Sequence, residues 1–378
     1  MKRKAVMLLA AATLGVMLTA CGGGEEAKKE EKTETPVIVM EEPKEEEPVQ
    51  EEAEPEAEPQ DEEFREGYYR SELTNEWIDE SLRNQRPIAA MVDNESTALP
   101  HFGVNDCDIV YEMTNSKANG GITRLMCIAK DWGSIAQLGS IRSVRPTNLQ
   151  IAPEYGAVVC HDGGPEIYIN TFLKLPFCRH LSGGFKRIDN GKAREYTEYI
   201  TTGEVASRLE KEKISSEYET DYYQGGSHFN FASESDPVDL SSASGSKGAS
   251  DIALPFKHNS SKLKYDSGKG LYMYSEYGSA HVDGKTGEQT GFKNVILLSA
   301  KMNVFDDNGY MQFNVIEVKD RDGFYCTNGS CIPIKWSKDN DLAYTRYYDE
   351  SGSEIKVNTG KTYIAIIPSE DFDSLTID

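Results

Sequence analysis

Short apolar runs that end in turn residues recur along the first half of the chain. Such runs are typical of buried strands, because a strand covered on both faces carries apolar side chains at nearly every position. They predict strands over 88–94, 108–113, 121–130, 136–143 and 156–164. A capping-box pattern, Thr201-x-x-Glu204, precedes Val205 and Leu209 one turn apart, which predicts an amphipathic helix over 201–213.

The second half of the chain carries turn dipeptides at short intervals. They are Asp283-Gly284, Asn308-Gly309, Asp322-Gly323, Asn328-Gly329 and Thr359-Gly360. Between them lie runs rich in β-branched and aromatic residues, such as 294–305 and 362–368. Repeated short strands of this kind predict an antiparallel sheet or a small barrel.

Together these patterns predict an α+β protein with two domains. The first, residues 67–238, is an α/β domain with a mixed sheet. The second, residues 253–378, is a β-rich antiparallel domain. Between them, residues 239–252 form a run of small and polar side chains that is typical of an interdomain linker.

The N-terminus, residues 1–21, has the layout of a secretory signal. A basic patch at 2–4 is followed by an apolar stretch over 6–20 and a small-residue site before Cys21. The last four residues, Leu-Thr-Ala-Cys, resemble the lipobox of bacterial lipoproteins, in which the cysteine is lipidated and becomes the new N-terminus. The alternative is an ordinary cleaved signal in which Cys21 is incidental. The lipobox interpretation places the protein on the extracytoplasmic face of a membrane, held by its lipid.

The segment 22–66 is acidic and rich in proline. It carries 19 acidic against 5 basic side chains and cannot bury enough apolar surface to offset the entropy of ordering, so we expect a disordered tether. The tether therefore carries -14 of the formal charge of -23, the signal segment +3 and residues 67–378 the remaining -12. The chain lacks a basic footprint, and we expect no nucleic-acid partner.

Six cysteines follow the lipobox, and only one pair can be assigned from the sequence. In YCTNGSCI, the Asn-Gly dipeptide predicts a type I′ hairpin turn, which places Cys326 opposite Cys331 within disulfide range. The alternative is two reduced thiols on an edge hairpin. The pairing of the other four cysteines stays open; they are Cys107, Cys127, Cys160 and Cys178.

Several motifs resemble the YerB-like lipoproteins of Gram-positive bacteria. In the first domain they are RPIAAMVDN, DIVYEM, GGITRLMCIAK, LGSIRSVRP and GAVVCHDGG, and in the second they are GSCIPIKWSK and YYDESGSEIKVNTGKTYIAIIP. The motifs follow one another in order over nearly all of residues 73–378. One departure is AREYTEYI at 193–200, which stands where the family has His-Asn. The resemblance implies a lipid anchor and two domains, the second of them β-rich, and it implies no enzyme activity.

Charged side chains embedded in the apolar strands of the first domain form the candidate site. Arg142 and Arg145 stand three residues apart, and two arginines in an apolar setting need an anion, either a carboxylate of the chain or a ligand's phosphate or carboxylate. We expect Arg142 to be deep and structural, and Arg145, next to Pro146, to be exposed and to face a ligand. His161, at a strand end, is a third candidate anion-binding residue.

Four more residues are candidates for catalysis or for internal pairing: Asp93, Glu112, Arg124 and Asp162. The internal interpretation pairs Glu112 with Arg124 across the hairpin at 114–121. The six histidines show no metal-ligand spacing, and nucleophile-elbow and phosphate-loop motifs are lacking, so we expect no metal and no cofactor.

Two functional hypotheses follow from these residues. The leading one is a non-enzymatic module, held at the membrane by an N-terminal lipid, that binds an anionic envelope component such as a cell-wall polymer, or an envelope protein. The alternative is a transferase or hydrolase that acts on a phosphate-bearing envelope glycopolymer or lipid-linked substrate.

Overall fold

A computed structural model describes residues 64–117 and 120–378. The predicted signal with Cys21, and the predicted tether 22–66 apart from its last three residues, lie outside the described residues. Within the described ranges, none of the helices has the length and apolar character needed to span a bilayer.

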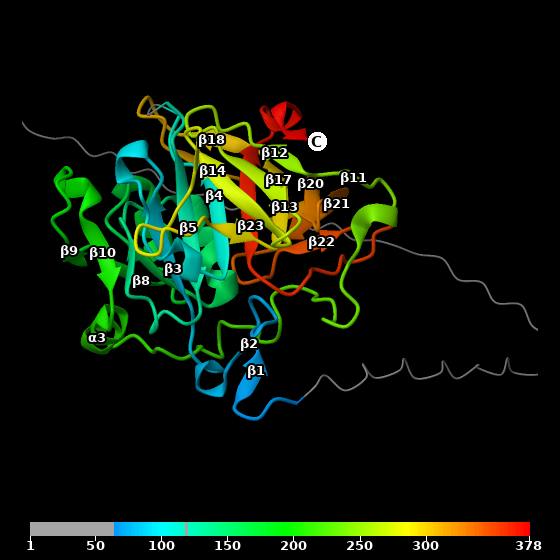
Figure 1. The fold of residues 1–378 in the computed structure, drawn as a ribbon. Coiled ribbons are helices and arrows are strands. Elements are labelled where there is room, and N and C mark those ends of the chain that lie inside the picture. The colour runs from blue at the N-terminus through cyan, green and yellow to red at the C-terminus, as the bar shows by residue number, and fades with distance from the viewer. Residues whose placement is uncertain (1–63, 118–119) are drawn as a thin grey trace, which may run out of the picture. The chain divides into compact units, whose positions relative to one another are not determined.

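The centre of the fold is a mixed sheet of eleven strands (Figure 1). Its order is β11-β21-β20-β17-β23-β4-β5-β3-β7-β8, and β22 pairs with β21. The strands are β3 (Ile88–Asp93), β4 (Ile109–Thr114), β5 (Thr123–Ala129), β7 (Val158–His161), β8 (Arg179–Ser182), β11 (Lys247–Gly248), β17 (Asn294–Ala300), β20 (Val318–Thr327), β21 (Ser330–Lys338), β22 (Arg346–Tyr348) and β23 (Thr362–Pro368). β3, β4 and β5 are buried at every position, because both faces of the sheet are covered. The predicted α+β class and mixed sheet are confirmed.

Four smaller sheets and three α-helices complete the regular structure of the described residues, together with short 3₁₀ turns. The six-stranded sheet contains β12 (Asp251–Ala253), β13 (Lys262–Asp266), β14 (Leu271–Glu276), β15 (Ser279–Ala280), β16 (Gly291–Phe292) and β24 (Thr376–Ile377). The others are formed by β6 (Gln137–Gly139), β9 (Lys186–Arg187) and β10 (Glu198–Thr201), by β1 (Tyr68–Arg70) and β2 (Trp77–Asp79), and by β18 (Met302–Val304) and β19 (Met311–Phe313).

The helices are α1 (Pro146–Ile151), α2 (Glu166–Leu173) and α3 (Glu204–Glu212). The 3₁₀ turns are η1 (Glu80–Leu82), η2 (Ser96–Ala98), η3 (Val104–Asp106), η4 (Ala152–Tyr155), η5 (Arg194–Tyr196), η6 (Leu240–Ser242) and η7 (Phe372–Ser374). α3 is the helix that the capping-box pattern predicts, but it begins at Glu204 with Gly203 as its N-cap, so Thr201 lies before the helix and not at its N-cap. The Glu204 carboxylate accepts hydrogen bonds of 3.0 Å from the amide and from the hydroxyl of Thr201.

The two predicted domains share the large sheet. β23, near the C-terminus, pairs in parallel with β4 of the N-terminal half. The segment 239–252, predicted as a linker, instead contains η6, β11 and the start of β12. Its small polar residues favour no element by themselves, but their backbone groups pair with β21 and β13. The described residues therefore belong to one compact unit.

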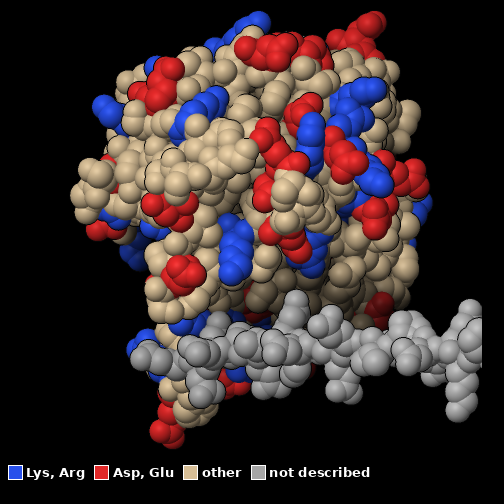
Figure 2. All heavy atoms as spheres, turned by 90° about the vertical axis from the view of Figure 1, so that its right-hand side faces the viewer, with Lys and Arg blue, Asp and Glu red and all other residues tan. Residues whose placement is uncertain are grey.

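Basic and acidic side chains are interspersed on the face of the molecule shown in Figure 2. Exposed ion pairs such as Lys117 with Glu370, at 2.8 Å, join side chains of opposite sign. Isolated exposed pairs of this kind contribute about 0–1 kcal/mol each, so their main effect is on solubility rather than on the fold.

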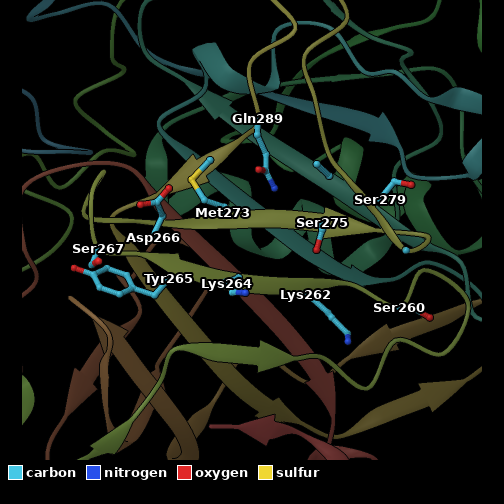
Figure 3. Close-up of a pocket in the computed structure, with 12 residues that line it drawn as sticks. Ser260, Lys262, Lys264, Tyr265, Asp266, Ser267, Met273, Ser275, Ser279 and Gln289 are labelled. Atoms are coloured by element: carbon cyan, nitrogen blue, oxygen red, sulfur yellow. The ribbon is translucent and has the colours of Figure 1, made fainter.

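The six-stranded sheet carries a surface hollow of about 900 Å³. Figure 3 shows Lys262 and Tyr265 on β13 and Met273 and Ser275 on the neighbouring β14 among the side chains that line it. None of the residues predicted to form the site lines this hollow.

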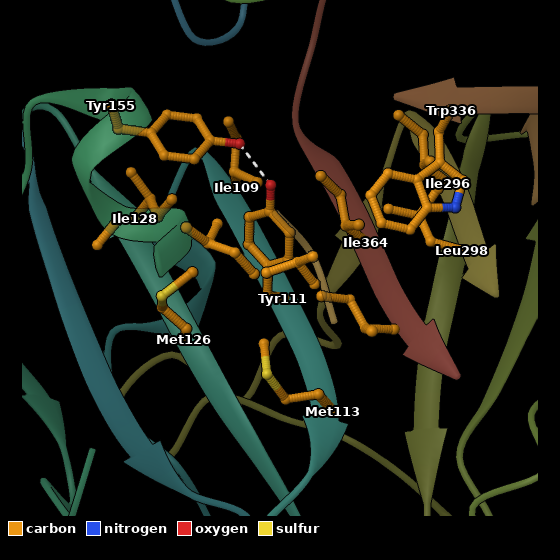
Figure 4. Close-up of a cluster of buried hydrophobic side chains, with 14 of the residues drawn as sticks. Ile109, Tyr111, Met113, Met126, Ile128, Tyr155, Ile296, Leu298, Trp336 and Ile364 are labelled. Atoms are coloured by element: carbon orange, nitrogen blue, oxygen red, sulfur yellow. Dashed lines mark hydrogen bonds between the residues drawn. The ribbon is translucent and has the colours of Figure 1, made fainter. Parts of the chain in front are cut away.

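Two apolar clusters pack against the large sheet, and alternate residues of its strands divide between them. In β3, Met91 belongs to the first cluster and Val92 to the second, as the two-residue period of a strand requires. Figure 4 shows the first cluster, in which the hydroxyls of Tyr111 and Tyr155 lie 2.7 Å apart and Trp336 packs near Ile296. Each large apolar side chain buried in this way contributes about 1.5–3 kcal/mol.

β20 and β21 form the predicted hairpin. Its register places Cys326 directly opposite Cys331, with Cα atoms 4.0 Å apart, and the two sulfurs are joined as a disulfide. Asn328 and Gly329 both have positive φ, 51° and 77°, as a type I′ turn requires. The four other described cysteines are buried free thiols.

Candidate functional site

Asp93 is the centre of a group of arginines at the end of β3. It lies directly opposite Arg124 of β5, so both side chains are on the same face of the sheet. Nη2 of Arg124 is 3.8 Å from Oδ1 of Asp93, and Nε of Arg142 is 2.8 Å from Oδ2. The prediction that Arg124 pairs with Glu112 is therefore wrong, because its partner is Asp93.

The backbone on either side of Arg142 holds it at the ends of two parallel strands. Its amide donates to the carbonyl of Met91 at 2.8 Å, and its carbonyl accepts from the amide of Asp162 at 3.0 Å. β3 and β7 run in parallel. Met91 lies near the carboxyl end of β3, and Asp162 directly follows the carboxyl end of β7. Ligands commonly bind at this edge of open α/β sheets.

Arg145 is buried, whereas the side chain of Arg142 is 27% exposed, so the depths expected for the two arginines are reversed. The reason is that the chain turns at Pro146 to begin α1, and Arg145 becomes the buried residue before that helix. Its guanidinium donates to two backbone carbonyls, at 3.3 and 3.0 Å, and forms no carboxylate pair within the described residues. Burial, with the nearby positive charge of Arg124, lowers the pKa of Arg145 to about 9.

Arg124 has unused hydrogen-bond donors. Its side chain is only 5% exposed, yet Nε and Nη1 have no hydrogen-bond partner among the described residues. Arg124 and Arg142 thus share one buried carboxylate, Asp93, and Arg142 also lies 3.2 Å from the half-exposed Glu195, whereas Arg145 has no carboxylate partner among the described residues. We call Arg124, Arg142, Arg145 and Asp93 the arginine cluster. Positive charge and buried donors without acceptors are both costly unless an anion is bound.

Glu112 lies on the other face of the sheet. Its cross-strand neighbour is Leu125, one position away from Arg124, and a shift of one residue turns the side chains to opposite faces. There its carboxylate accepts hydrogen bonds from the hydroxyls of Thr123, Ser261, Tyr274 and Tyr363. Burial raises the pKa of Glu112. Glu112 therefore belongs to a buried polar network and not to the arginine cluster.

The side chains of His161 and Asp162 contact groups outside the arginine cluster. Nδ1 of His161 lies 2.8 Å from the carbonyl of Gly163, and its Nε2 lies 3.3 Å from Nδ1 of His180. Burial lowers the pKa of His161 to about 4, so the ring is neutral at pH 7. The carboxylate of Asp162 lies 3.4 Å from Arg187. His161 is thus not a cation that an anionic ligand would use at neutral pH.

Two histidines that the sequence did not single out come together in the fold. Nδ1 of His101 lies 2.8 Å from Nε2 of His281, and Oε1 of Glu276 lies 3.8 Å from the same nitrogen. His101 and His281 are 180 residues apart, so no spacing rule finds them. The one signal in the sequence is Glu276, an acid at the end of an aromatic-rich strand.

Comparisons with known proteins agree with the motifs in the sequence. Residues 73–215 match the family described as "Protein of unknown function (DUF3048) N-terminal domain", and residues 252–364 match the corresponding C-terminal domain. A curated Bacillus subtilis (strain 168) relative, "Putative lipoprotein YerB", is 22% identical over 316 residues, which cover 80% of this chain and 88% of the relative. The crystal structure of YerB protein from Bacillus subtilis has a similar fold, with a TM-score of 0.69 and 20% identity, covering 82% of this chain and 99% of that one.

Proposed function

Since the chain belongs to the DUF3048 family, whose description names no activity, we propose a role from its own residues: it is a lipid-anchored module that binds an anionic component of the cell envelope. The arginine cluster is the binding site, and the group it recognises is a phosphate or a carboxylate. A phosphate-bearing cell-wall polymer is the ligand class that we favour, because a phosphate offers several oxygens to several guanidiniums at once.

The observation that carries the proposal is the state of Arg124. Two of its nitrogens are buried without acceptors, and the neighbouring Arg145 has no carboxylate partner among the described residues. A bound anion would accept the free donors and neutralise the excess positive charge. Arg142, the most exposed of the three, gives the cluster its contact with solvent.

The membrane anchor rests on the N-terminal residues. The basic patch, the apolar stretch and the small residues before Cys21 are those of a lipoprotein signal. The name of the Bacillus subtilis relative, which calls it a lipoprotein, agrees with this assignment. Lipidation of Cys21 would hold the folded part at the extracytoplasmic face of the membrane, where cell-wall polymers are found.

The catalytic alternative, a transferase or hydrolase for a phosphate-bearing envelope substrate, has less support. It needs an acid or base without an internal partner beside the arginines. Glu112 lies on the other face of the sheet, Asp93 is paired with two arginines, and Asp162 faces Arg187. Binding without chemistry is the simpler use of this arrangement.

Binding of inorganic pyrophosphate and of a purified wall glycopolymer tests the proposal. The full chain, solubilised in detergent, is titrated by calorimetry with each probe, and the polymer is used before and after chemical removal of its phosphate. We expect binding of pyrophosphate and of the intact polymer only. Arg124→Met and Arg145→Met should weaken binding at least tenfold, because each removes a buried charge-assisted contact of about 1.5–3 kcal/mol.

Arg179→Met is the matched control. Its guanidinium is held by both oxygens of Glu219, at 2.8 and 2.9 Å, so its loss should leave the affinity unchanged. Equal weakening by the control would show that binding follows net charge and would contradict the proposal. Turnover of the polymer by the wild-type chain, abolished by Asp93→Asn, would instead favour the catalytic alternative.

A further inference from the structure

A second buried polar group lies where the two halves of the sequence meet. One ring nitrogen of His101, one of His281 and one carboxylate oxygen of Glu276 all lie within 4.8 Å of one another. The three residues are 0%, 2% and 1% exposed. His101 comes from the segment between η2 and η3, Glu276 ends β14, and His281 directly follows β15.

We propose that His101, Glu276 and His281 bind one divalent first-row transition ion, with zinc as the best match. Imidazole nitrogen and carboxylate oxygen are ligands that zinc prefers. Ligand atoms at about 2.0–2.2 Å from a tetrahedral ion lie roughly 3.4 Å from each other. The separations of 2.8 Å between the histidine nitrogens and 3.8 Å between His281 and Glu276 lie on either side of that value.

The hydrogen bonds around His281 orient its ring for this role. The hydroxyl of Thr290 donates its single proton to Oδ1 of Asn105, so it can only accept from Nδ1 of His281, 2.8 Å away. Nδ1 therefore carries the proton, and Nε2 presents a lone pair toward His101 and Glu276. Metal-bound histidines are held in this way by an acceptor on the outer nitrogen.

Glu276 supplies the charge that the ion needs. Its Oε2 accepts hydrogen bonds from Asn259 and Tyr274, both at 3.4 Å. Its Oε1, which faces His281, is buried and has no hydrogen-bond partner among the described residues. A buried carboxylate oxygen without a partner is costly. A cation between the three side chains would remove this cost.

The site lies near a surface hollow and joins distant parts of the chain. A hollow of about 350 Å³ is lined in part by Asn105 and Thr290, and the hydroxyl of Thr290 contacts Nδ1 of His281, on the side of the ring away from the proposed ion. Since His101 belongs to the N-terminal half and the other two ligands to the C-terminal half, the ion would join the two halves of the chain. All three ligands are buried, and because they supply three of the four positions around a tetrahedral ion, a water molecule would take the fourth.

Metal content tests the proposal directly. The detergent-solubilised full chain is stripped with a chelator, reloaded with zinc and dialysed, and its zinc is measured by mass spectrometry. We expect one zinc per chain in the wild type and loss of that zinc in His101→Ala, Glu276→Gln and His281→Ala. His161→Ala is the matched control and should keep the zinc, because His161 belongs to another close histidine pair, with its Nε2 3.3 Å from Nδ1 of His180, outside the proposed site.

A variant at a residue outside the ligand set separates a loss of zinc binding from a loss of the fold. Thr290→Val removes the acceptor that orients His281 and should weaken zinc binding about 10–100-fold, whereas Thr290→Ser should bind like the wild type. X-ray absorption of the zinc-loaded wild type should show nitrogen and oxygen ligands only. A folded wild type that binds no zinc, sulfur ligands from the buried thiols, or equal affinity in Thr290→Val and Thr290→Ser would each overturn the proposal.

Discussion

Replacing Arg145 by methionine tests whether the arginine cluster is built for stability or for a ligand. Burial and neighbouring charge lower the pKa of Arg145 from 12.5 to about 9. At 1.36 kcal/mol per pKa unit, this corresponds to a cost of about 5 kcal/mol for keeping the guanidinium charged in the folded state. The side chain stays charged at pH 7 and the folded protein therefore carries this cost.

Methionine removes the charge but also removes two hydrogen bonds to backbone carbonyls, at 3.3 and 3.0 Å. Each hydrogen bond from this charged donor contributes about 1.5–3 kcal/mol, so roughly 3–6 kcal/mol of stability is lost. The net expectation for Arg145→Met is a change of between about -1 and +2 kcal/mol in the free energy of unfolding, in line with other replacements of buried charge by apolar groups, which are often neutral or stabilising.

Urea unfolding followed by tryptophan fluorescence measures the change, with Arg142→Met as the comparison. Arg142→Met removes the 2.8 Å pair with Asp93 and leaves that carboxylate with Arg124 at 3.8 Å, so we expect a loss of stability of about 1–3 kcal/mol. A loss of more than about 2 kcal/mol in Arg145→Met would refute the reasoning, because Arg145 would then be a net stabilising residue and not a group held ready for an anion.

Three further predictions concern the ends and the strand termini of the fold. Cys21→Ser should abolish metabolic fatty-acid labelling and release the protein from the membrane; an unlabelled wild type would contradict the anchor. The folded pKa of His161, about 4, lies below the ordinary 6.5, so the unfolded chain binds its proton first and stability falls as the pH falls from 6.5 toward 4. His161→Gln should therefore lose about 2 kcal/mol less than the wild type between pH 7 and pH 5 in urea unfolding. Mass spectrometry of unreduced peptides should find Cys326 joined to Cys331, and its reduction should cost about 2 kcal/mol for so short a loop; free alkylation of both thiols would rule the bond out.

Strands and local turns of this protein follow from its sequence because each depends on neighbouring residues. Continuous apolar runs mark β3, β4 and β5, the capping box marks α3, and an Asn-Gly turn sets the register of the β20–β21 hairpin. Each of these features is decided within about ten residues, where pattern and turn chemistry act directly.

The partners of the buried charged residues cannot be predicted from the local sequence in this way. Glu112 and Arg124 are one register position away from facing each other, and that single position sends them to opposite faces. The depth of Arg145 depends on where α1 begins. His101 and His281 meet only because two distant segments pack together. Long-range contacts of this kind are set by the whole fold and leave little mark on the local sequence.

The position of β23 has a consequence for how the chain must fold. β4 lies between β5 and β23, so until residues 362–368 arrive its second edge has no partner. An apolar six-residue strand with an open edge is a template for pairing with other chains. A protein truncated after residue 238 would keep that edge exposed and should aggregate, and in the intact chain the last-made strand of the large sheet protects one of the first.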